Sequence, residues 1–162
     1  TAVVGKKSVM EAAQNTFISS TFWTERIGPT AALATLKVME REKSWDKITA
    51  TGKKMQKGWL KLAKENKLDI TVSGIPALTT YAFTSKNALA YKTFITQEML
   101  KKGILASTQF YACTKHTTEH LDMYFDVLGD VYKRISKCES EILDINTLLD
   151  GPICHSGFKR LN

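Results

Sequence analysis

Three segments of the chain place apolar side chains at helical spacing. The clearest covers residues 45–67, where one narrow stripe at about 100° per residue contains Trp45, Ile48, Met55, Trp59 and Leu62. Ser44 precedes this stripe and is the expected N-cap. Residues 89–102 and 118–137 repeat the pattern, and Gly103 suits the end of the first of these. A helix is therefore predicted in each segment.

Residues 29–43 predict a fourth helix, because Pro29 is favoured at a first helical position. This segment is rich in alanine and apolar on most sides, a composition typical of a well-buried helix. Closer to the N-terminus, residues 8–14 predict one or two helical turns with Ser8 as N-cap. Residues 15–27 combine hydroxyl and aromatic side chains without a helical period, so we expect an ordered, irregular loop.

Short β-branched and aromatic runs predict the strands. Residues 2–7 and 104–106 each suggest one short strand. Residues 69–85 suggest two strands, or one bulged strand, around a break at Gly74 and Pro76. Strands that alternate with helices in this way indicate a small sheet covered by helices. The sequence therefore predicts an α+β fold with an antiparallel or mixed sheet.

Positive charge is concentrated on one side of the helix predicted at 45–67. Five lysines lie opposite its apolar stripe: Lys53, Lys57, Lys61, Lys64 and Lys67. The chain has a formal net charge of +7, so a nucleic-acid stripe is weighed against the solvated back of an amphipathic helix. Aromatic and arginine side chains are not interleaved for base stacking, which favours the solvated face and no nucleic-acid partner.

Composition limits the class of protein and the cellular compartment that we expect. Its 162 residues are 43% hydrophobic and 24% charged, which is typical of one globular domain with or without a tail and excludes a disordered chain. A run of about 18 apolar residues does not occur, so no membrane span is expected. Three widely spaced cysteines without a C-x-x-C pair favour reduced thiols and a cytoplasmic location.

Histidine, cysteine and charged side chains form three candidate chemical pairs. His116 and His120 have a spacing that metal sites use, but without an obvious third ligand a surface or capping role is favoured and no metal is predicted. Cys113 near His116 suggests a thiol nucleophile, although no third group that would orient the pair is apparent. Glu25 and Arg26 stand beside aromatic residues, where a charged pair is either well paired or functional.

Several stretches form a pattern that is found in a known enzyme family. Residues 18–33 read Ile-Ser-Ser-Thr-Phe-Trp-Thr-Glu-Arg-Ile-Gly-Pro-Thr-Ala-Ala-Leu and follow Ala-Val-Val-Gly at 2–5. Together they resemble class III pyridoxal-phosphate (PLP) aminotransferases, and most closely the glutamate-1-semialdehyde aminotransferase-like group. Residues 103–110 and 116–121 resemble the last strand and the final helix of that family. The resemblance implies a fold type I enzyme with a large PLP-binding domain, a small C-terminal domain and a homodimeric assembly.

The resemblance divides the chain into four parts. Residues 1–28 match the tail of the large PLP-binding domain, 29–44 a connecting helix, 45–137 the small C-terminal domain and 138–162 a C-terminal extension. Because the chain starts within a strand-like run, we expect a C-terminal fragment of a longer enzyme. The lysine that forms the Schiff base with PLP would then lie upstream of Thr1, and the isolated chain would be inactive.

Two hydroxyl residues are assigned to the cofactor by the same resemblance. Thr21 matches the threonine that contacts the PLP phosphate across the dimer interface, and Ser20 is a weaker companion. Hydroxyl and backbone N–H groups near a helix start make a suitable anion site. The alternative is that Thr21 bonds only to its own loop.

Four residues are assigned to the substrate pocket. Gln109 and Tyr111 follow the last family strand, with Tyr111 where semialdehyde enzymes carry a glutamate. Glu25 and Arg26 belong to a turn that is longer than in many relatives. Many related enzymes hold a substrate carboxylate with an arginine in this region, but no arginine lies between residues 41 and 134. A sugar or another polar amino substrate is therefore as compatible as an amino acid.

The resemblance implies an enzyme that moves an amino group between a small-molecule amino donor and an aldehyde or ketone by a ping-pong route. The carbonyl acceptor would be a semialdehyde or a sugar. The alternative hypothesis is a stand-alone basic module that binds an anionic ligand or nucleic acid, and it predicts salt-dependent binding.

Overall fold

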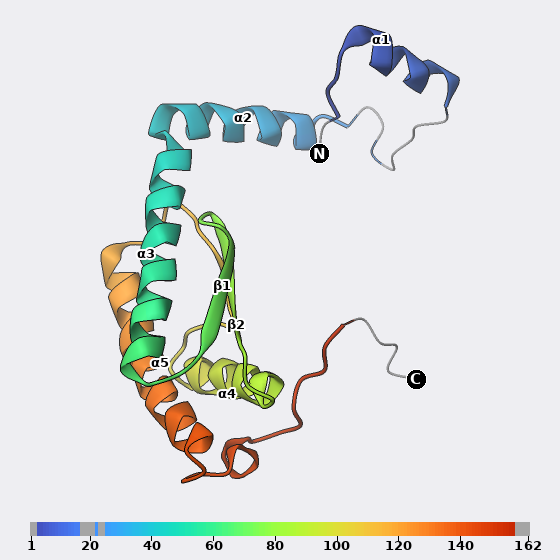
Figure 1. Ribbon diagram of the computed structural model, residues 1–162. Coiled ribbons are helices and arrows are strands. Elements are labelled where there is room, and N and C mark those ends of the chain that lie inside the picture. The colour runs from blue at the N-terminus through green and yellow to red at the C-terminus, as the bar shows by residue number, and fades with distance from the viewer. Residues whose placement is uncertain (1–2, 17–21, 23–24, 158–162) are drawn as a thin grey trace. The chain divides into compact units, whose positions relative to one another are not determined.

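The computed structural model describes residues 3–16, 22 and 25–157 (Figure 1). The chain forms two compact units, Thr1–Glu40 and Arg41–Asn162. Within the described ranges, no helix combines the length and the apolar character that crossing a membrane requires.

The N-terminal unit is helical. It contains helix α1 (Lys7–Met10), the 3₁₀ helix η1 (Glu11–Asn15) and all but the last two residues of helix α2 (Ile27–Glu42). The strand predicted at 2–7 is wrong in its described part, because residues 3–6 are exposed and form no regular structure. An extended run needs a neighbouring strand for its backbone groups. The helical turns predicted at 8–14 are confirmed, but their N-cap is Lys6 and not Ser8, and it makes no side-chain capping bond.

Helix α2 does not have the burial that its composition predicts. It begins at Ile27, two residues before the predicted start at Pro29, and buries none of its residues. Leu33 is 62% exposed and Leu36 is 60% exposed. An apolar helix is buried only where another surface covers it, and composition alone does not supply that surface.

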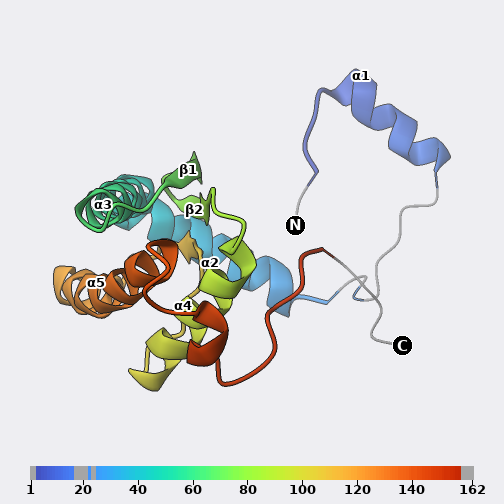
Figure 2. The same cartoon turned by 60° about the horizontal axis from the view of Figure 1, so that its bottom comes forward.

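The second unit is a three-stranded sheet with helices against one face. Its elements in order are α3 (Ser44–Glu65), β1 (Ile70–Ile75), β2 (Leu78–Phe83), α4 (Ala88–Lys101), β3 (Gln109–Tyr111), α5 (Thr118–Glu139) and η2 (Ile145–Leu148). Strand β2 pairs antiparallel with β1 on one side and with β3 on the other. Helices α3 and α5 run side by side (Figures 1 and 2). The predicted α+β fold with a small antiparallel sheet is confirmed.

The core lies between the helices and the covered face of the sheet. Thr79, Tyr81 and Phe83 of β2 are buried, while Leu78 and Ala82 on the other face are exposed. Large side chains of the three helices fill the space opposite them: Met55, Trp59, Tyr91, Phe94, Ile95, Met99, Leu128, Tyr132 and Ile135. The core is therefore formed by alternate residues of β2 and by residues at helical spacing on the three helices.

The amphipathic pattern of α3 is confirmed with two differences. Met55 and Trp59 are fully buried and the five lysines opposite them are exposed, but Trp45 remains 47% exposed. The N-cap is Lys43, which has a φ of 47°, and Ser44 is the first residue of the helix and is buried. Because α2 ends one residue earlier, a single residue makes the turn between the helices and leaves no place for a serine cap.

Helix α3 meets the β1–β2 hairpin in direct backbone contact. Pro76 and Ala77 connect the two strands, and Gly74 before them has a φ of 85°, a conformation that favours glycine. A Cβ atom on Gly52 of α3 would lie 1.7 Å from the carbonyl oxygen of Pro76. Of the two predicted alternatives, the structure has two strands joined in a hairpin, and Gly74 adopts the positive φ close to its turn.

The strand predicted at 104–106 lies further along the chain. Ile104 still belongs to the end of α4, because its N–H donates to the carbonyl of Met99 at 3.0 Å. Pairing with β2 begins only at Thr108, whose carbonyl accepts the N–H of Tyr81 at 2.9 Å. Of the apolar residues that suggested a strand, Ile104 is bonded to the end of α4 and Leu105 lies in a loop.

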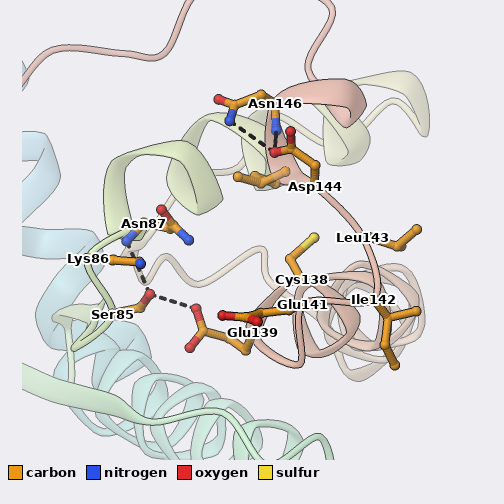
Figure 3. A pocket seen from close by; sticks show the side chains of 11 residues that line it. Ser85, Lys86, Asn87, Cys138, Glu139, Glu141, Ile142, Leu143, Asp144 and Asn146 are labelled. Carbon is orange, nitrogen blue, oxygen red and sulfur yellow. Dashed lines mark hydrogen bonds between the residues drawn. The ribbon is translucent and has the colours of Figure 1, made fainter.

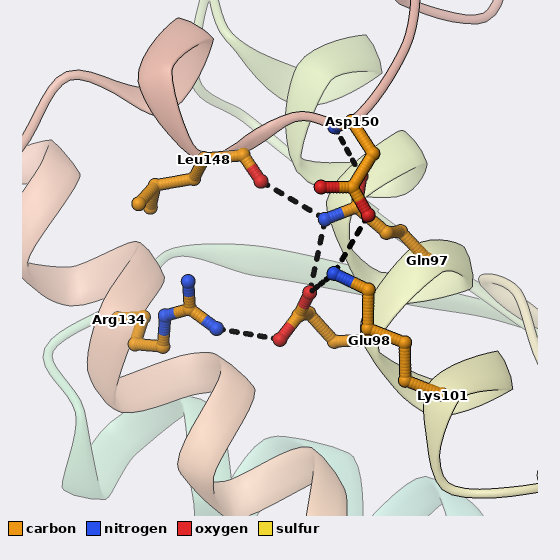
Figure 4. Close-up of polar contacts among 6 residues, drawn as sticks. All are labelled: Gln97, Glu98, Lys101, Arg134, Leu148 and Asp150. Carbon is orange, nitrogen blue, oxygen red and sulfur yellow. Dashed lines mark hydrogen bonds and ion pairs between the residues drawn. The ribbon is translucent and has the colours of Figure 1, made fainter.

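The segment after α5 is fastened along α4 (Figure 4). Gln97 donates from Nε2 to the carbonyl of Leu148 at 2.9 Å and accepts the N–H of Asp150 at 2.7 Å. Thr93, one turn earlier, accepts the N–H of Cys154 at 2.9 Å. Side chains of α4 therefore hold the backbone of this segment.

Candidate functional site

Four residues that the sequence singles out in the second unit line one cleft, whereas Cys113 does not. The cleft lies beside β3 and the start of α5 and has a volume of about 330 Å³. Gln109, Tyr111, His116 and His120 all line it. The other walls are apolar or aromatic: Met55, Ile104, Leu105, Ala106, Phe110, Leu121, Met123 and Tyr124. This cleft is the candidate site.

His116 is held by the backbone in front of α5. Its Nδ1 accepts the N–H of Cys113 at 3.0 Å, and its ring packs on Phe110 with the centroids 4.8 Å apart. Burial, and then the charge of His120, lower the pKa of His116 below its ordinary value. Because a backbone N–H can only donate, the neutral ring carries its proton on Nε2. The bond to Cys113 involves its backbone and not its thiol, so it does not form the predicted thiol–imidazole pair.

His120 takes part in the N-terminal cap of α5. Its N–H donates to Thr117 Oγ1 at 3.4 Å, and its Nδ1 accepts the N–H of Thr117 at 3.2 Å. This reciprocal pair is a capping box with histidine in the place that glutamate or glutamine usually takes. Over the described part of the chain, no three potential metal ligands are grouped. The favoured capping interpretation of this histidine therefore agrees with the structure.

Gln109 and Tyr111 stand on the open face of the sheet. Strand β3 places Phe110 opposite Thr79, toward the helices, and turns the residues on either side of it the other way. Tyr111 is 67% exposed, and Gln109 is exposed too. Both residues therefore border the cleft from its solvent side.

A buried phenol forms part of the inner wall. Tyr124 accepts a hydrogen bond at its hydroxyl from Nε1 of Trp59 at 2.8 Å. Burial raises the pKa of Tyr124 well above its ordinary value, so the phenol is neutral. The hydroxyls of Tyr81 and Tyr132 are also buried, and neither has a hydrogen-bond partner among the residues that the structure describes.

The apolar walls are the part of the site that the sequence did not reveal. Leu105 was assigned to a strand, yet it lies in a loop and is 91% exposed. Met123 is half-exposed on α5, and Leu121 on the same helix is buried. The histidine pair was a sequence signal for this cleft, because both histidines line it.

The site residues predicted in the N-terminal part are placed only in part. Thr21 and Ser20 lie outside the described residues. Glu25 is half-buried, and its Oε1 accepts the N–H of Gly28 at 3.0 Å, which caps the start of α2. Arg26 is exposed, and its carbonyl accepts the N–H of Thr30 at 3.0 Å.

The polar residues of a second, larger cleft connect the ends of helices (Figure 3). The cleft measures about 670 Å³ and lies between the start of α4 and the end of α5. Glu139 accepts hydrogen bonds there from Ser85 at 2.6 Å and from the hydroxyl of Tyr91. Asp144 accepts the N–H of Asn146 at 2.9 Å and caps η2. These carboxylates tie helix ends together, and none of the predicted site residues lines this cleft.

An ionic cluster links α4 to α5 (Figure 4). Glu98 receives a hydrogen bond from Arg134 at 2.5 Å and another from Lys101 at 2.9 Å, and the Arg134 guanidinium lies 4.5 Å from the ring centroid of Phe94. Burial alone would raise the pKa of Glu98, but hydrogen bonds from Gln97, Lys101 and Arg134 outweigh it and lower the pKa. The cluster is part of the helix packing and not of the candidate site.

Comparisons of sequence find similarity to aminotransferases and to an aminomutase. The chain is 31% identical over 145 residues to a glutamate-1-semialdehyde 2,1-aminomutase of Clostridium botulinum, which covers 77% of the chain. It is 26% identical over 142 residues to a 3-aminobutyryl-CoA aminotransferase of Cloacimonas acidaminovorans, covering 84%. It is 27% identical over 136 residues to a 2'-deamino-2'-hydroxyneamine transaminase of Streptomyces kanamyceticus, covering 80%. Each match spans 34% of the relative's own length. No family model matches the chain.

A comparison of structures agrees with the sequence. The fold is similar to a solved structure of the PLP internal aldimine form of FumI protein from Sphingopyxis sp. MTA144, with a TM-score of 0.73 and 15% identity. The similarity covers 90% of this chain and 36% of that one. The resemblance found in the sequence is thereby confirmed, and the chain is a relative of the class III PLP-dependent aminotransferases and glutamate-1-semialdehyde aminomutases.

Proposed function

We propose that the chain supplies the C-terminal part of a PLP-dependent class III aminotransferase or aminomutase. The observation that carries the proposal is the similarity to two aminotransferases and an aminomutase over 77–84% of the chain, joined to a shared fold. The complete enzyme transfers an amino group between a small-molecule donor and an aldehyde or ketone. It works as a homodimer.

The parts of the chain have different tasks under this proposal. Residues 1–28 complete the large domain, 29–44 connect the domains, 45–137 form the small domain and 138–162 extend it. PLP, when bound, supplies the electron sink for the reaction. The lysine that attaches it lies upstream of Thr1, so the isolated chain does not transfer amino groups.

Two hydroxyl residues of this chain bind the cofactor phosphate in the proposed enzyme. Thr21 donates its hydroxyl proton to a phosphate oxygen, and Ser20 supports it. Both precede the N-terminus of α2 in the sequence, and the positive end of a helix dipole favours an anion. Glu25 caps that helix through the N–H of Gly28.

The chain also contributes to the proposed substrate pocket. Gln109 and Tyr111 offer an amide and a phenol at the edge of the cleft. Glu25 and Arg26 supply charge from the N-terminal part. With Tyr111 in place of a glutamate, the pocket takes a semialdehyde or sugar through hydrogen bonds and not through a second carboxylate.

Substitution of Thr21 tests the cofactor role. In the full-length polypeptide, Thr21→Ala removes a hydrogen bond to a charged phosphate, which contributes roughly 1.5–3 kcal/mol. We expect PLP to bind about tenfold to a hundredfold more weakly. Thr35→Ala is the matched control, because its hydroxyl is exposed and donates to the carbonyl of Ala31 within the same helix. Equal PLP dissociation constants for the two variants would remove Thr21 from the site.

The isolated 162-residue chain tests the position of the attaching lysine. After incubation with PLP and reduction with borohydride, we expect only scattered, substoichiometric labelling of surface lysines in peptide maps. Stoichiometric labelling of one lysine would show that the attaching residue lies within this chain and would contradict its placement upstream of Thr1.

A further inference from the structure

The cleft beside β3 is lined by uncharged side chains and by two imidazoles. Its twelve lining residues, all within the described part of the chain, include neither Lys nor Arg and neither Asp nor Glu. Burial lowers the pKa of His116, which keeps that imidazole neutral at neutral pH. A charged group buried here would lose its hydration without gaining a counter-ion. The cleft therefore selects against carboxylates and ammonium groups.

The histidine and tyrosine side chains that line the cleft include hydrogen-bond donors. Backbone N–H groups occupy Nδ1 of His116 and of His120, so the N–H that each ring can offer is the one at Nε2. Tyr124 accepts the indole N–H of Trp59 at its hydroxyl oxygen. Donors without opposing charge match an uncharged acceptor such as a carbonyl oxygen.

The remaining surface matches an apolar body. Ile104, Ala106, Phe110 and Leu121 supply aliphatic and aromatic walls, and Met55 and Met123 add side chains that adapt to irregular shapes. A volume of about 330 Å³ is at the lower end of the range for small-molecule sites. A ligand of about one ring and a short side chain fits such a volume.

We propose that this cleft binds an uncharged carbonyl compound with an apolar body, whose carbonyl oxygen accepts hydrogen bonds from the imidazole N–H groups of His116 and His120. The further identification of this compound as the amino-group acceptor of the enzyme rests on the proposed function. The cleft then narrows the acceptors of the proposed function, because it favours aldehydes and ketones with an apolar far end over polyhydroxylated sugars.

Methionine methyl NMR of the 162-residue chain measures this binding directly. The probes are acetophenone, which is neutral with a carbonyl, and benzoate and benzylamine, which are charged and of similar size. We expect acetophenone to shift the methyl signals of Met55 and Met123 to saturation, while the buried Met99, outside the cleft, stays unchanged. Benzoate and benzylamine should bind at least about tenfold more weakly.

Two variants locate the binding. Ala106→Trp fills the cleft and should abolish the methyl shifts, whereas Ala82→Trp on the exposed face of β2 should leave them unchanged. His116→Phe keeps an aromatic ring against Phe110 but removes the N–H donor. It should weaken acetophenone about fivefold, the equivalent of one neutral hydrogen bond of ~1 kcal/mol, and leave ethylbenzene unchanged.

Clear results would overturn the proposal. These are benzoate binding as tightly as acetophenone, a shift of Met99 without Met55 and Met123, or normal binding by the folded Ala106→Trp chain. The titration needs no PLP, so a failed amino transfer by the full-length enzyme counts against the proposed function alone. Failed probe binding counts against the cleft alone.

Discussion

At the level of single residues, the backbone decides what the two histidines can do. Spacing alone left His116 and His120 open to a metal role, a capping role or a partnership with Cys113. The structure gives each Nδ1 a backbone N–H, which fixes the tautomer and leaves one donor per ring. Such bonds depend on how the loop before α5 folds, so the sequence could name the residues but not their protonation.

The stability of the second unit should depend on pH through His116. Its pKa is lowered in the folded chain by burial and by the charge of His120. The unfolded chain then binds this proton at higher pH, near the ordinary value of 6.5. The stabilising contribution of neutral His116 is therefore complete above about pH 6.5 and is lost as the pH falls through the lower folded value.

Urea unfolding at a series of pH values tests this dependence. His116→Gln keeps a side-chain acceptor near the N–H of Cys113 and does not titrate. We expect the free energy of unfolding of the variant to fall less steeply between pH 7 and pH 5 than that of the unchanged chain. Parallel curves would show that His116 does not titrate differently in the two states.

At the level of elements, helical spacing was a reliable guide and short apolar runs were not. The three long helices of the second unit end within two residues of their predicted limits, because their apolar stripes face a real core. The runs at 2–7 and 104–106 look like strands, but a strand exists only where a neighbour pairs with it. Pairing of β3 with β2 is set by distant residues and could not be read locally.

The contact of α3 with the hairpin predicts an unequal effect of two glycine substitutions. A Cβ at position 52 would overlap the backbone of Pro76, so Gly52→Ala should destabilise the chain by about 1–3 kcal/mol in urea unfolding. Gly129 on α5 has Leu62 Cδ2 as its nearest neighbour, at 3.7 Å. Gly129→Ala should be neutral or stabilising by about 0.5–1 kcal/mol. Equal losses for both variants would contradict the close approach at Gly52.

The segment after α5 should detach when its side-chain partner on α4 is shortened. Gln97→Ala removes the hydrogen bonds to Leu148 and Asp150. Each contributes ~1 kcal/mol, so amide hydrogen exchange at Asp150 should accelerate about tenfold or more. Exchange at Cys154 shows whether the rest of the segment follows, and amides within α5 serve as the internal reference. Unchanged exchange at Asp150 would show that Gln97 does not hold this segment.

At the scale of the whole molecule, resemblance and physical analysis contribute different things. Residues 18–33 pointed to PLP-dependent aminotransferases, and the relatives support that recognition. Periodicity predicted the α+β architecture independently. The burial of α2 was predicted wrongly because burial depends on neighbours and not on composition. The apolar lining of the cleft could not be predicted from the sequence, because most of its residues come from the loop at 104–106, β3 and α5, which only the fold brings together.

The measurement that tests the central claim most directly is amino transfer by the full-length polypeptide that carries these residues. The purified protein is incubated with an amino donor and a ketone or aldehyde, with and without PLP, and the new amine is quantified. We predict product only when PLP, donor and acceptor are all present, with initial rates that follow a ping-pong pattern. A folded, full-length protein that neither retains PLP nor forms any amine across such donors and acceptors would contradict the account.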